Sequence, residues 1–234
     1  MTVFYTVNTG VCLQNESGMI IIDAIHQGKD VGFSNMPEML WPKLRQPLLS
    51  LWTHLHPDHF DAEGAERLAE MLPEATLWAP EYVGNNVIPQ EISEGIIAIQ
   101  QGTVTVYLIK AVHDGRKFAG VPLYVPVVTD GRRCCVLATD ALITETLIRK
   151  IRFVCPQIIE GLFINLYQWG SKEQRKLLLT LPSKQIYLYH LPFPEDDSLH
   201  WKEWAQKLIA QANETRAVKI LPPLYTVMLS DPDK

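Results

Sequence analysis

Three of the chain's seven histidines lie within six consecutive positions, in the stretch WTHLHPDHFD at residues 52–61. His54, His56 and His59 are accompanied there by Asp58, so four ionisable side chains share one short segment. Packing alone rarely satisfies so many polar groups, whereas imidazole and carboxylate together form a ligand set for Zn²⁺, Fe or Mn²⁺. The stretch therefore predicts a metal site, and two adjacent sub-sites would use all four groups.

The segments on either side of this stretch indicate how its side chains converge. The apolar run LLSLWT at 48–53 is typical of a buried central strand. Alternation in extended backbone places His54 and His56 on the same side of that strand end. Pro57 ends the strand pattern, and an amphipathic helix is predicted at 61–72. The remaining two ligands of the stretch would then lie in the turn before that helix.

This HxHxDH pattern after a buried strand resembles the hallmark of the metallo-β-lactamase superfamily, and the similarity extends along most of the chain. The segment GMIIIDAI looks like the family's second strand, which ends in a structural aspartate, here Asp23. The family adds three ligands at later strand ends, and the sequence offers His113 after TVTVYLIKAV, Asp140 after RRCCVLAT and His190 after KQIYLY. The resemblance implies the family's fold, a four-layer αββα sandwich of two mixed β-sheets flanked by helices.

The resemblance also implies how seven ligands would be divided between two divalent metal ions. One metal would be held by His54, His56 and His113, the other by Asp58, His59 and His190, and Asp140 would bridge both. Zinc is the first expectation for these donors, with iron or manganese as alternatives.

Two of the later ligand positions have rivals. Asp130 also follows a predicted strand, but the pair Asp130-Gly131 is typical of a tight hairpin turn, which favours Asp140 as the ligand. His200 competes with His190, but it falls inside a predicted amphipathic helix beside Trp201, where a structural histidine is expected.

Other polar side chains are candidates for supporting roles. His26 follows Asp23 on a loop that the family's fold would bring near the site, so it is a candidate substrate contact, with a solvated loop position as the alternative. Asp61 and Asp114 either orient ligand histidines or are solvated turn residues. The stretches 28–47 and 80–89 are candidate pocket walls. Their aromatic side chains either line the pocket or belong to the core, which is the default expectation: Phe33, Trp41 and Tyr82.

Strand-like and helical segments alternate along the chain, which predicts one α/β domain over residues 1–234, with sheets packed on each other and covered by helices. Strands are expected at 2–8, 19–25, 48–53, 75–80, 95–100, 103–112, 122–129, 132–139, 157–165, 184–189, 217–221 and 225–229. Helices are expected at 36–44, 61–72, 140–151, 171–181 and 197–213, the last capped by Asp197 or Ser198.

Charge and composition limit the classes of partner that the chain is expected to bind. A net charge of −5 does not indicate a broad positive face, so nucleic acid is not an expected partner. The chain shows no signal-peptide pattern and no apolar run of membrane-spanning length, so a cytoplasmic protein without membrane contact is expected. Its four cysteines are expected to be reduced and packed as small apolar residues. A small-molecule substrate and a homo-oligomer are compatible with this composition.

The ligand set predicts a reaction class. Two metals about 3.5–4 Å apart can share a hydroxide that attacks a substrate polarised by one of them. We therefore expect hydrolysis of an ester, lactone, thioester or phosphodiester bond, with Asp58 as the catalytic group that orients the hydroxide or passes a proton to the leaving group. No cysteine stands at a proposed ligand position, which disfavours the family's cysteine-bearing β-lactamases.

Two other readings remain open. The first is a mononuclear iron oxidoreductase on the same fold, similar to the family's persulfide dioxygenases, which use fewer ligands. The second is a non-catalytic binding protein that has kept the fold, whose expected mark is the loss of one or more ligands. The complete ligand set favours the hydrolase over both.

Overall fold

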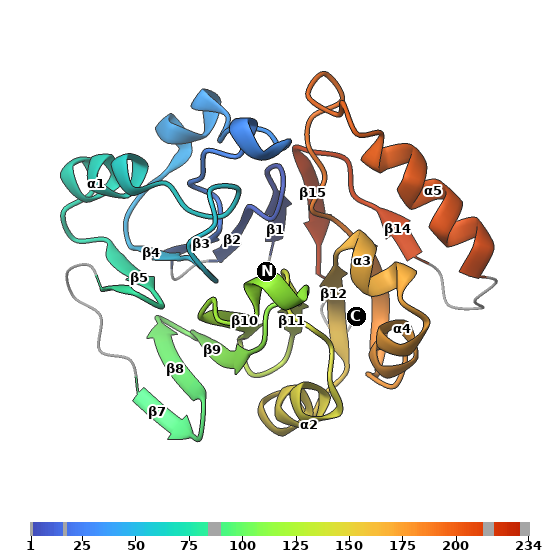
Figure 1. Cartoon of the computed structure of the whole chain (residues 1–234). Helices are drawn as coiled ribbons and strands as arrows, with labels where there is room; N and C mark the ends of the chain where they lie inside the picture. Colours follow the sequence, from blue (N-terminus) through green and yellow to red (C-terminus); the bar gives the residue numbers. More distant parts are fainter. Residues whose placement is uncertain (1, 16–17, 84–89, 213–217, 230–234) are drawn as a thin grey trace.

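Two mixed β-sheets form the centre of the molecule (Figure 1). The computed structural model describes residues 2–15, 18–83, 90–212 and 218–229. The first sheet has the order β15-β1-β2-β3-β4-β5-β6, with β1 (Thr2–Tyr5), β2 (Val11–Asn15), β3 (Gly18–Ile22), β4 (Leu48–Leu51), β5 (Thr76–Ala79), β6 (Tyr82–Val83) and β15 (Tyr225–Met228). The second has the order β14-β13-β12-β11-β10-β9-β8-β7, with β7 (Gln90–Ser93), β8 (Ile96–Gln101), β9 (Val104–Ala111), β10 (Leu123–Thr129), β11 (Cys134–Leu137), β12 (Ile159–Ile164), β13 (Ser183–Leu188) and β14 (Val218–Ile220).

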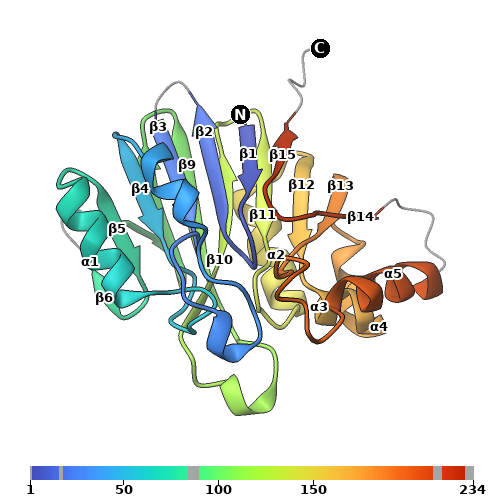
Figure 2. The same cartoon turned by 90° about the horizontal axis from the view of Figure 1, so that it is seen from above.

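Helices cover the outer faces of both sheets (Figure 2). On the first sheet lie α1 (Ala62–Met71) and the short 3₁₀ turns η1 (Lys29–Val31) and η2 (Glu38–Lys43). Beside the second sheet lie α2 (Glu145–Val154), α3 (Leu166–Gly170), α4 (Lys172–Leu178) and α5 (Trp201–Ala212). A further 3₁₀ turn, η3 (Arg116–Phe118), follows β9.

The apolar core has three layers, which confirms the predicted four-layer αββα sandwich. One layer lies between the sheets and includes Leu49 of β4 and Leu137 of β11. A second joins the first sheet to α1 through side chains such as Leu68. The third joins the second sheet to α2, α4 and α5 and includes Val136 and Ile151. Period-two alternation along β11 sends Val136 and Leu137 to different layers, as expected for a strand buried on both faces.

The connections explain why both sheets are mixed. Strands β11, β12, β13 and β14 pair in parallel, and a parallel pair needs a crossover long enough to hold a helix. The helices α2 to α5 occupy those crossovers. Strands β7 to β10 pair antiparallel, and β10 joins β11 through the predicted Asp130-Gly131 hairpin, where Gly131 has φ of +85°. That left-handed conformation suits glycine, which has no Cβ to clash.

Several predicted elements differ in the structure. Strand β2 and helix α3 were not expected from the sequence. Helix α2 begins at Glu145 rather than 140, because Thr144 takes extended backbone and its hydroxyl accepts the Leu147 N–H as N-cap. Helix α5 begins only at Trp201, after His200 with φ of +56°, so His200 precedes the helix. Asp197 still caps that helix, since its carboxylate accepts the Trp201 N–H at 2.7 Å.

The cysteines depart from the expectation of four reduced thiols. A disulfide joins Cys134 of β11 to Cys155 at the end of α2, whereas Cys12 and Cys135 are free and buried. The alternation of β11 explains this difference, because it points Cys134 at the helical layer and Cys135 at the layer between the sheets. Among the helices that the structure describes, none has the length and apolar character needed to cross a membrane.

Candidate metal centre

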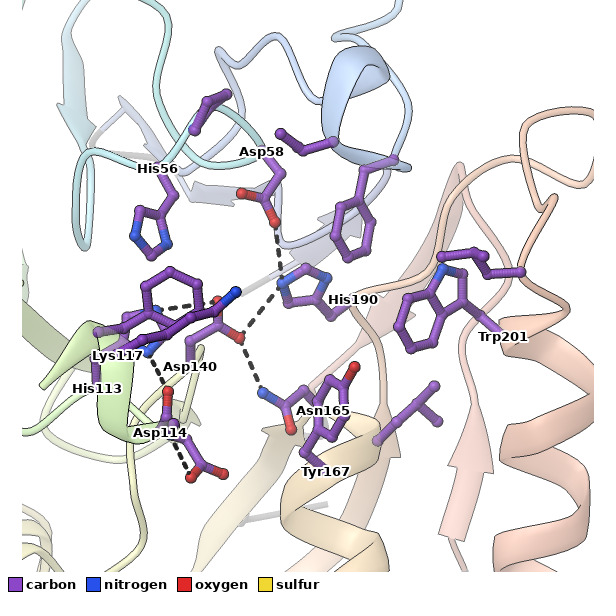
Figure 3. A pocket seen from close by; sticks show the side chains of 17 residues that line it. His56, Asp58, His113, Asp114, Lys117, Asp140, Asn165, Tyr167, His190 and Trp201 are labelled. Carbon is purple, nitrogen blue, oxygen red and sulfur yellow. Dashed lines mark hydrogen bonds and ion pairs between the residues drawn. The ribbon is translucent and has the colours of Figure 1, made fainter.

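Seven histidine and aspartate side chains converge where strands from both sheets end. Five of them line the pocket that Figure 3 shows. They form two groups, in each of which one ligand atom per residue lies within 4.8 Å of the others. The first group contains His54, His56, His113 and Asp140, and the second contains Asp58, His59, Asp140 and His190. The structure thus brings together all seven residues singled out in the sequence. They come from the loops after β4, β9, β11 and β13.

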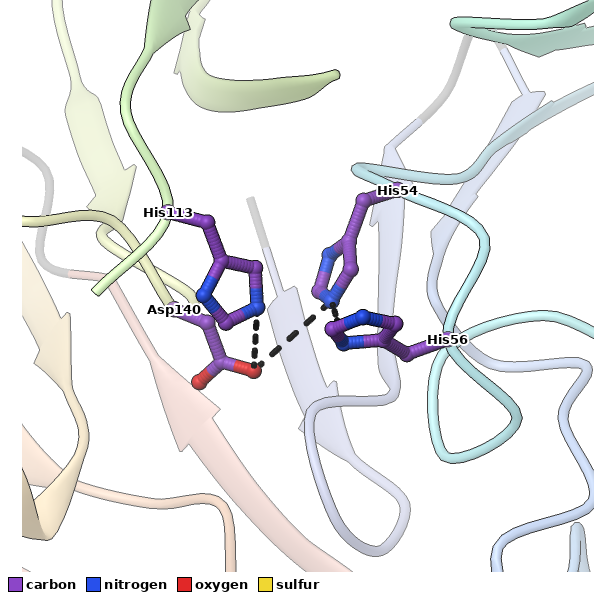
Figure 4. Close-up of side chains that lie close together, drawn as sticks. All are labelled: His54, His56, His113 and Asp140. Carbon is purple, nitrogen blue, oxygen red and sulfur yellow. Dashed lines mark hydrogen bonds and ion pairs between the residues drawn. The ribbon is translucent and has the colours of Figure 1, made fainter. Parts of the chain in front are cut away.

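The first group presents three imidazoles to one carboxylate (Figure 4). His54 Nε2 lies 3.0 Å from His56 Nδ1 and 3.7 Å from Asp140 Oδ2, and His113 Nε2 also lies 3.7 Å from that oxygen. Burial, followed by repulsion from His59, holds the pKa of His54 well below its usual value. Burial and the neighbouring His113 also lower the pKa of His56. Neutral imidazoles offer lone pairs, which is the form that binds metal.

The second group combines two imidazoles with two carboxylates. Asp140 Oδ2 lies 3.1 Å from His59 Nε2, and Asp140 Oδ1 lies 3.4 Å from His190 Nε2. Asp58 Oδ2 lies 3.5 Å from His190 Nε2 and 3.8 Å from His59 Nε2. Burial opposes the charged form of His59, but Asp58 and Asp23 outweigh it and hold the pKa of His59 well above its usual value.

Asp140 belongs to both groups, and its carboxylate lies between them. Burial would raise its pKa, but the adjacent His190 and His59 hold that pKa well below the usual range. Its Oδ1 also accepts a hydrogen bond from Asn165 Nδ2 at 2.9 Å. Both oxygens of the carboxylate are therefore held in place, one by an amide and both by histidines.

Neighbouring groups orient the histidines from behind. Asp23 is completely buried, and its Oδ2 lies 2.9 Å from His59 Nδ1. The other ring nitrogen of His113, Nδ1, lies 2.6 Å from the Asp114 carbonyl oxygen. The Thr53 hydroxyl oxygen lies 3.1 Å from His54 Nδ1. Such contacts fix which nitrogen carries the proton and leave the other nitrogen free for a metal.

Backbone strain concentrates at the strand ends that carry these groups. Asp23, Thr139 and His190 have φ of +49°, +47° and +64°. Residues other than glycine seldom adopt this conformation, and a β-branched threonine does so least readily. Strain of this kind, of order 1–3 kcal/mol per residue, clusters at functional sites because the surrounding structure must hold it.

Hydrogen bonds between loops hold the strained segments together. The Thr139 N–H donates to the hydroxyl of the buried Tyr189 at 3.1 Å, which joins the loop of Asp140 to the loop of His190. Gln168 Nε2 donates to the carbonyl oxygens of Ala138, Thr139 and Ala141. Asn165, Gln168 and Tyr189 were not predicted as site residues, although Asn165 is the last residue of the predicted strand 157–165 and so lies at a strand end, near which the seven grouped side chains also occur.

The other polar side chains singled out in the sequence do not belong to either group. His200 is a surface residue whose side chain is 74% exposed. Asp61 pairs with Gln27 at 2.9 Å and contacts none of the ligand histidines. Asp114 does contact His113, but through its backbone carbonyl, because its carboxylate accepts from Gln174 and from the Gly115 N–H.

His26 does not reach the cavity, which corrects its assignment as a substrate contact. It is only 1% exposed and is not among the residues that line the cavity. Its Nδ1 lies 3.3 Å from Asn8 Nδ2, whereas its Nε2 has no hydrogen-bond partner among the described residues. Burial and repulsion from His59 and His190 lower the pKa of His26 to about 3, so the ring is neutral. His26 is therefore buried against the Asn8 side chain and away from the cavity lining.

Asp130 serves the hairpin instead of the metal centre. Its Oδ1 accepts the backbone N–H groups of Arg132 and Arg133 at 3.1 and 2.7 Å, and its Oδ2 accepts Arg133 Nε at 2.8 Å. Burial would raise the pKa of Asp130, but these hydrogen bonds lower it below the usual value.

We expect Asp130→Asn to reduce the free energy of unfolding by about 1 kcal/mol at pH 7, because the amide cannot replace the charge-assisted bonds. A carboxyl with a lowered folded pKa stabilises the fold above its unfolded pKa and loses that contribution as pH falls through the folded pKa. The deficit of the variant should therefore be full at pH 7 and shrink below about pH 4. Urea denaturation of both proteins at several pH values measures this; an equal deficit at all pH values would contradict it.

A cavity of about 710 Å³ opens over the two groups. Its floor includes His56, Asp58, His113, Asp140 and His190. Its walls carry mainly apolar and aromatic side chains, among them Phe33, Phe118, Tyr167 and Trp201 (Figure 3). Of the wall residues proposed from the sequence, Phe33 does line the cavity, which corrects its default assignment to the core. Trp41 packs in the core with α1, and the side chain of Tyr82 and residues 84–89 lie outside the described part.

The donor set fits a pair of divalent cations. Ring nitrogens of His54 and His56 lie 3.0 Å apart, and burial lowers the pKa of both rings, which favours the neutral form that can offer a lone pair to a metal. The buried His113 Nε2 has no hydrogen-bond partner in the described part of the chain. Lone pairs aimed at a shared point are what a cation requires, and nitrogen with oxygen donors suits zinc, iron or manganese.

The sequence matches no protein-family model and no curated protein. Solved structures are similar to this chain in fold. The metallo-β-lactamase fold protein YhfI from Bacillus subtilis is 13% identical, with a TM-score of 0.60 over 97% of this chain and 99% of its own. A protein described as a possible metal-dependent hydrolase from Veillonella parvula is also 13% identical, with a TM-score of 0.70 over 98% and 99%.

A third similar structure is CmlA, a diiron β-hydroxylase from Streptomyces venezuelae. It is 13% identical, with a TM-score of 0.62 over 97% of this chain, which spans 54% of the CmlA chain. At such low identity these likenesses establish the fold alone. The chain has the metallo-β-lactamase fold, as the sequence motif predicted.

Proposed function

We propose that this chain is a dinuclear metal-dependent hydrolase that cleaves an ester, lactone, thioester or phosphodiester bond in a small molecule. The observation that supports this most is the pair of four-residue groups sharing Asp140 at the floor of one cavity. Similar folds occur in proteins named as metal-dependent hydrolases, which agrees with the proposal.

The seven residues would have two roles, metal binding and proton transfer. A pair of divalent cations, when bound, would polarise the substrate oxygen and bring the pKa of a water molecule near neutrality. His54, His56 and His113 would hold one cation, and His59, His190 and Asp58 the other. Asp140 would contribute to both sites, because its Oδ2 faces His113 of the first group and its Oδ1 faces His190 of the second.

Asp58 is the residue we assign to proton transfer. It lies on the cavity floor and is 7% exposed, so it meets both the substrate and the second group. Its Oδ2 is oriented by His190 Nε2 at 3.5 Å. A carboxylate in that position can accept the proton of the attacking water and return it to the leaving group.

Metal-dependent oxidation is the second candidate, and the fold of the diiron β-hydroxylase CmlA favours considering it. A mononuclear iron site would use only one of the two groups and leave the other without a purpose. A binding protein without activity would have no need for the complete set of seven.

Metal analysis tests the proposal. The purified protein should contain about two equivalents of divalent metal per chain, and a strong chelator should abolish hydrolysis of at least one of a panel of lactones, thioesters and phosphodiesters. Adding back zinc, manganese or iron should restore that activity. Iron in the protein, at one or two equivalents per chain, together with oxygen consumption and no hydrolysis would instead support metal-dependent oxidation and overturn our proposal.

A further inference from the structure

We propose that the natural substrate carries an apolar group at least as large as a benzene ring, bound between two aromatic walls above the metal centre. This inference rests on the proposed function, because it assigns the substrate class of that same site. Four observations carry it: an aromatic wall on each side, an exposed apolar rim, and the scarcity of lysine and arginine side chains in the cavity lining.

The first wall is a continuous row of rings from three separate segments (Figure 3). The Phe33 ring lies 4.6 Å from the ligand His190 and stacks on Trp201, with centroids 5.8 Å apart and planes 11° apart. Tyr167 meets Trp201 edge to face at 6.0 Å. Rings arranged in this way offer faces and edges to another aromatic or apolar group.

This wall is held rigidly. Asn8 donates from Nδ2 to the Ser34 carbonyl oxygen at 2.7 Å, and its Oδ1 accepts the Ser34 N–H at 3.2 Å. The Ser34 hydroxyl in turn accepts the Phe193 N–H at 2.9 Å, which ties the loop of Phe33 to the segment after His190. A wall that is already ordered costs a ligand little conformational entropy on binding.

The second wall stands over the other metal group. The Phe118 ring lies 4.8 Å from His56 and 5.0 Å from His113. An apolar group on the floor of the cavity would therefore have an aromatic surface on both sides, one near each metal group.

The rim of the cavity is apolar although it faces solvent. Val31, Tyr167 and Leu199 line the cavity and are 49%, 54% and 60% exposed. Single exposed apolar residues are ordinary, but three around one opening mark a surface that an apolar ligand would cover.

The charge of the lining argues against a strongly anionic substrate. Lys117 is the one lysine or arginine among the described residues that line the cavity, and its ammonium lies over the Phe118 ring at 4.5 Å. The lining also includes the carboxylates of Asp58 and Asp114. Away from the two cations that the proposed function places on the floor, a substrate with several anionic groups would find only Lys117 to pair with. A substrate whose reacting group meets the cations and whose body is apolar is therefore favoured over a nucleotide or another substrate with several anionic groups.

Hydroxamic acids test this in the zinc-loaded protein, because the hydroxamate binds metal while the tail probes the walls. Calorimetric titration should show benzohydroxamate binding at least tenfold more tightly than acetohydroxamate. Equal affinities would contradict the inference about the substrate but not the proposed metal centre. Failure of both compounds to bind would overturn the proposed function, and the inference with it.

Variants of the exposed rim test whether the preference for benzohydroxamate arises at the opening of the cavity. Val31→Asp combined with Leu199→Asp should reduce the preference for benzohydroxamate at least fivefold and change acetohydroxamate affinity less than twofold. Both positions are exposed, so the fold should tolerate the changes. Phe153→Asp on α2 is the matched control, since Phe153 is 67% exposed and lies outside the cavity lining. A loss of preference in the control equal to that in the rim variant would overturn the inference.

Discussion

Replacing Asp140 by alanine is expected to reduce hydrolysis by about a thousandfold and to leave less than one equivalent of bound metal per chain. The reason is that Asp140 alone belongs to both metal groups, so its loss removes a ligand from each. Its removal also leaves His59 Nε2 and His190 Nε2 with the more distant Asp58 as the remaining carboxylate that faces them among the described residues. Several kcal/mol of lost stabilisation correspond to roughly a thousandfold in rate.

The measurements are metal content and kcat/KM for whichever substrate of the panel is hydrolysed. Asp130→Ala provides the matched control, because Asp130 also follows a strand but bonds only within its hairpin in the described structure. This control should retain full activity and metal. If Asp140→Ala kept two metals and wild-type turnover, the shared position of that carboxylate would have no functional meaning.

The seven side chains of the two groups were identified from the sequence in two ways, four by residue type and spacing and three by resemblance to the metallo-β-lactamase superfamily. Four of them lie in one segment, where residue types and spacing alone indicate a cation. His113, Asp140 and His190 are far apart in the sequence but share one mark, a place immediately beyond a strand-like run. Their grouping follows from the fold, because neighbouring strands end at the same edge.

The elements that escaped prediction lack such marks. Helix α3 has only five residues and depends on a capping box, in which the side-chain oxygens of Asn165 and Gln168 each accept a hydrogen bond from the other residue's backbone N–H. A helix that short has no hydrophobic period to detect. Strand β2 pairs with β1 across a turn at Asn8, which has φ of +54°. Asparagine adopts this conformation more often than most residues, but that preference is too weak to predict a turn from the residue type.

The substrate walls could not be derived from sequence for a more basic reason. Phe33 follows a 3₁₀ turn, Tyr167 lies on a short helix and Trp201 begins a long one. Nothing local indicates that these rings meet, because their contact depends on how three distant segments pack. A place in the core was therefore the better prediction for an aromatic residue from sequence alone. This prediction is right for Trp41 and wrong for Phe33.

Asp23→Asn should weaken metal binding at the second group by roughly 10–100-fold while largely preserving the fold. Asp23 Oδ1 accepts the Thr53 N–H at 2.7 Å, and its Oδ2 accepts the Thr53 hydroxyl at 2.7 Å and faces His59 Nδ1 at 2.9 Å. The carboxylate thereby keeps a proton on Nδ1 and leaves the lone pair of Nε2 for a metal. Asparagine must present its NH₂ group to either Thr53 or His59.

An amide that donates to His59 Nδ1 would move the ring proton to Nε2, which then cannot bind a metal. We expect one tightly bound metal, retained by His54, His56 and His113, and a second that is lost on dialysis. Thr9→Val is an informative comparison, because the Thr9 hydroxyl also lies 3.1 Å from His59 Nδ1 but carries no charge. It should lower affinity for the second metal less than Asp23→Asn does. Equal effects of the two variants would mean that the charge of Asp23 does not set the state of His59, and that the burial of that carboxylate needs another explanation.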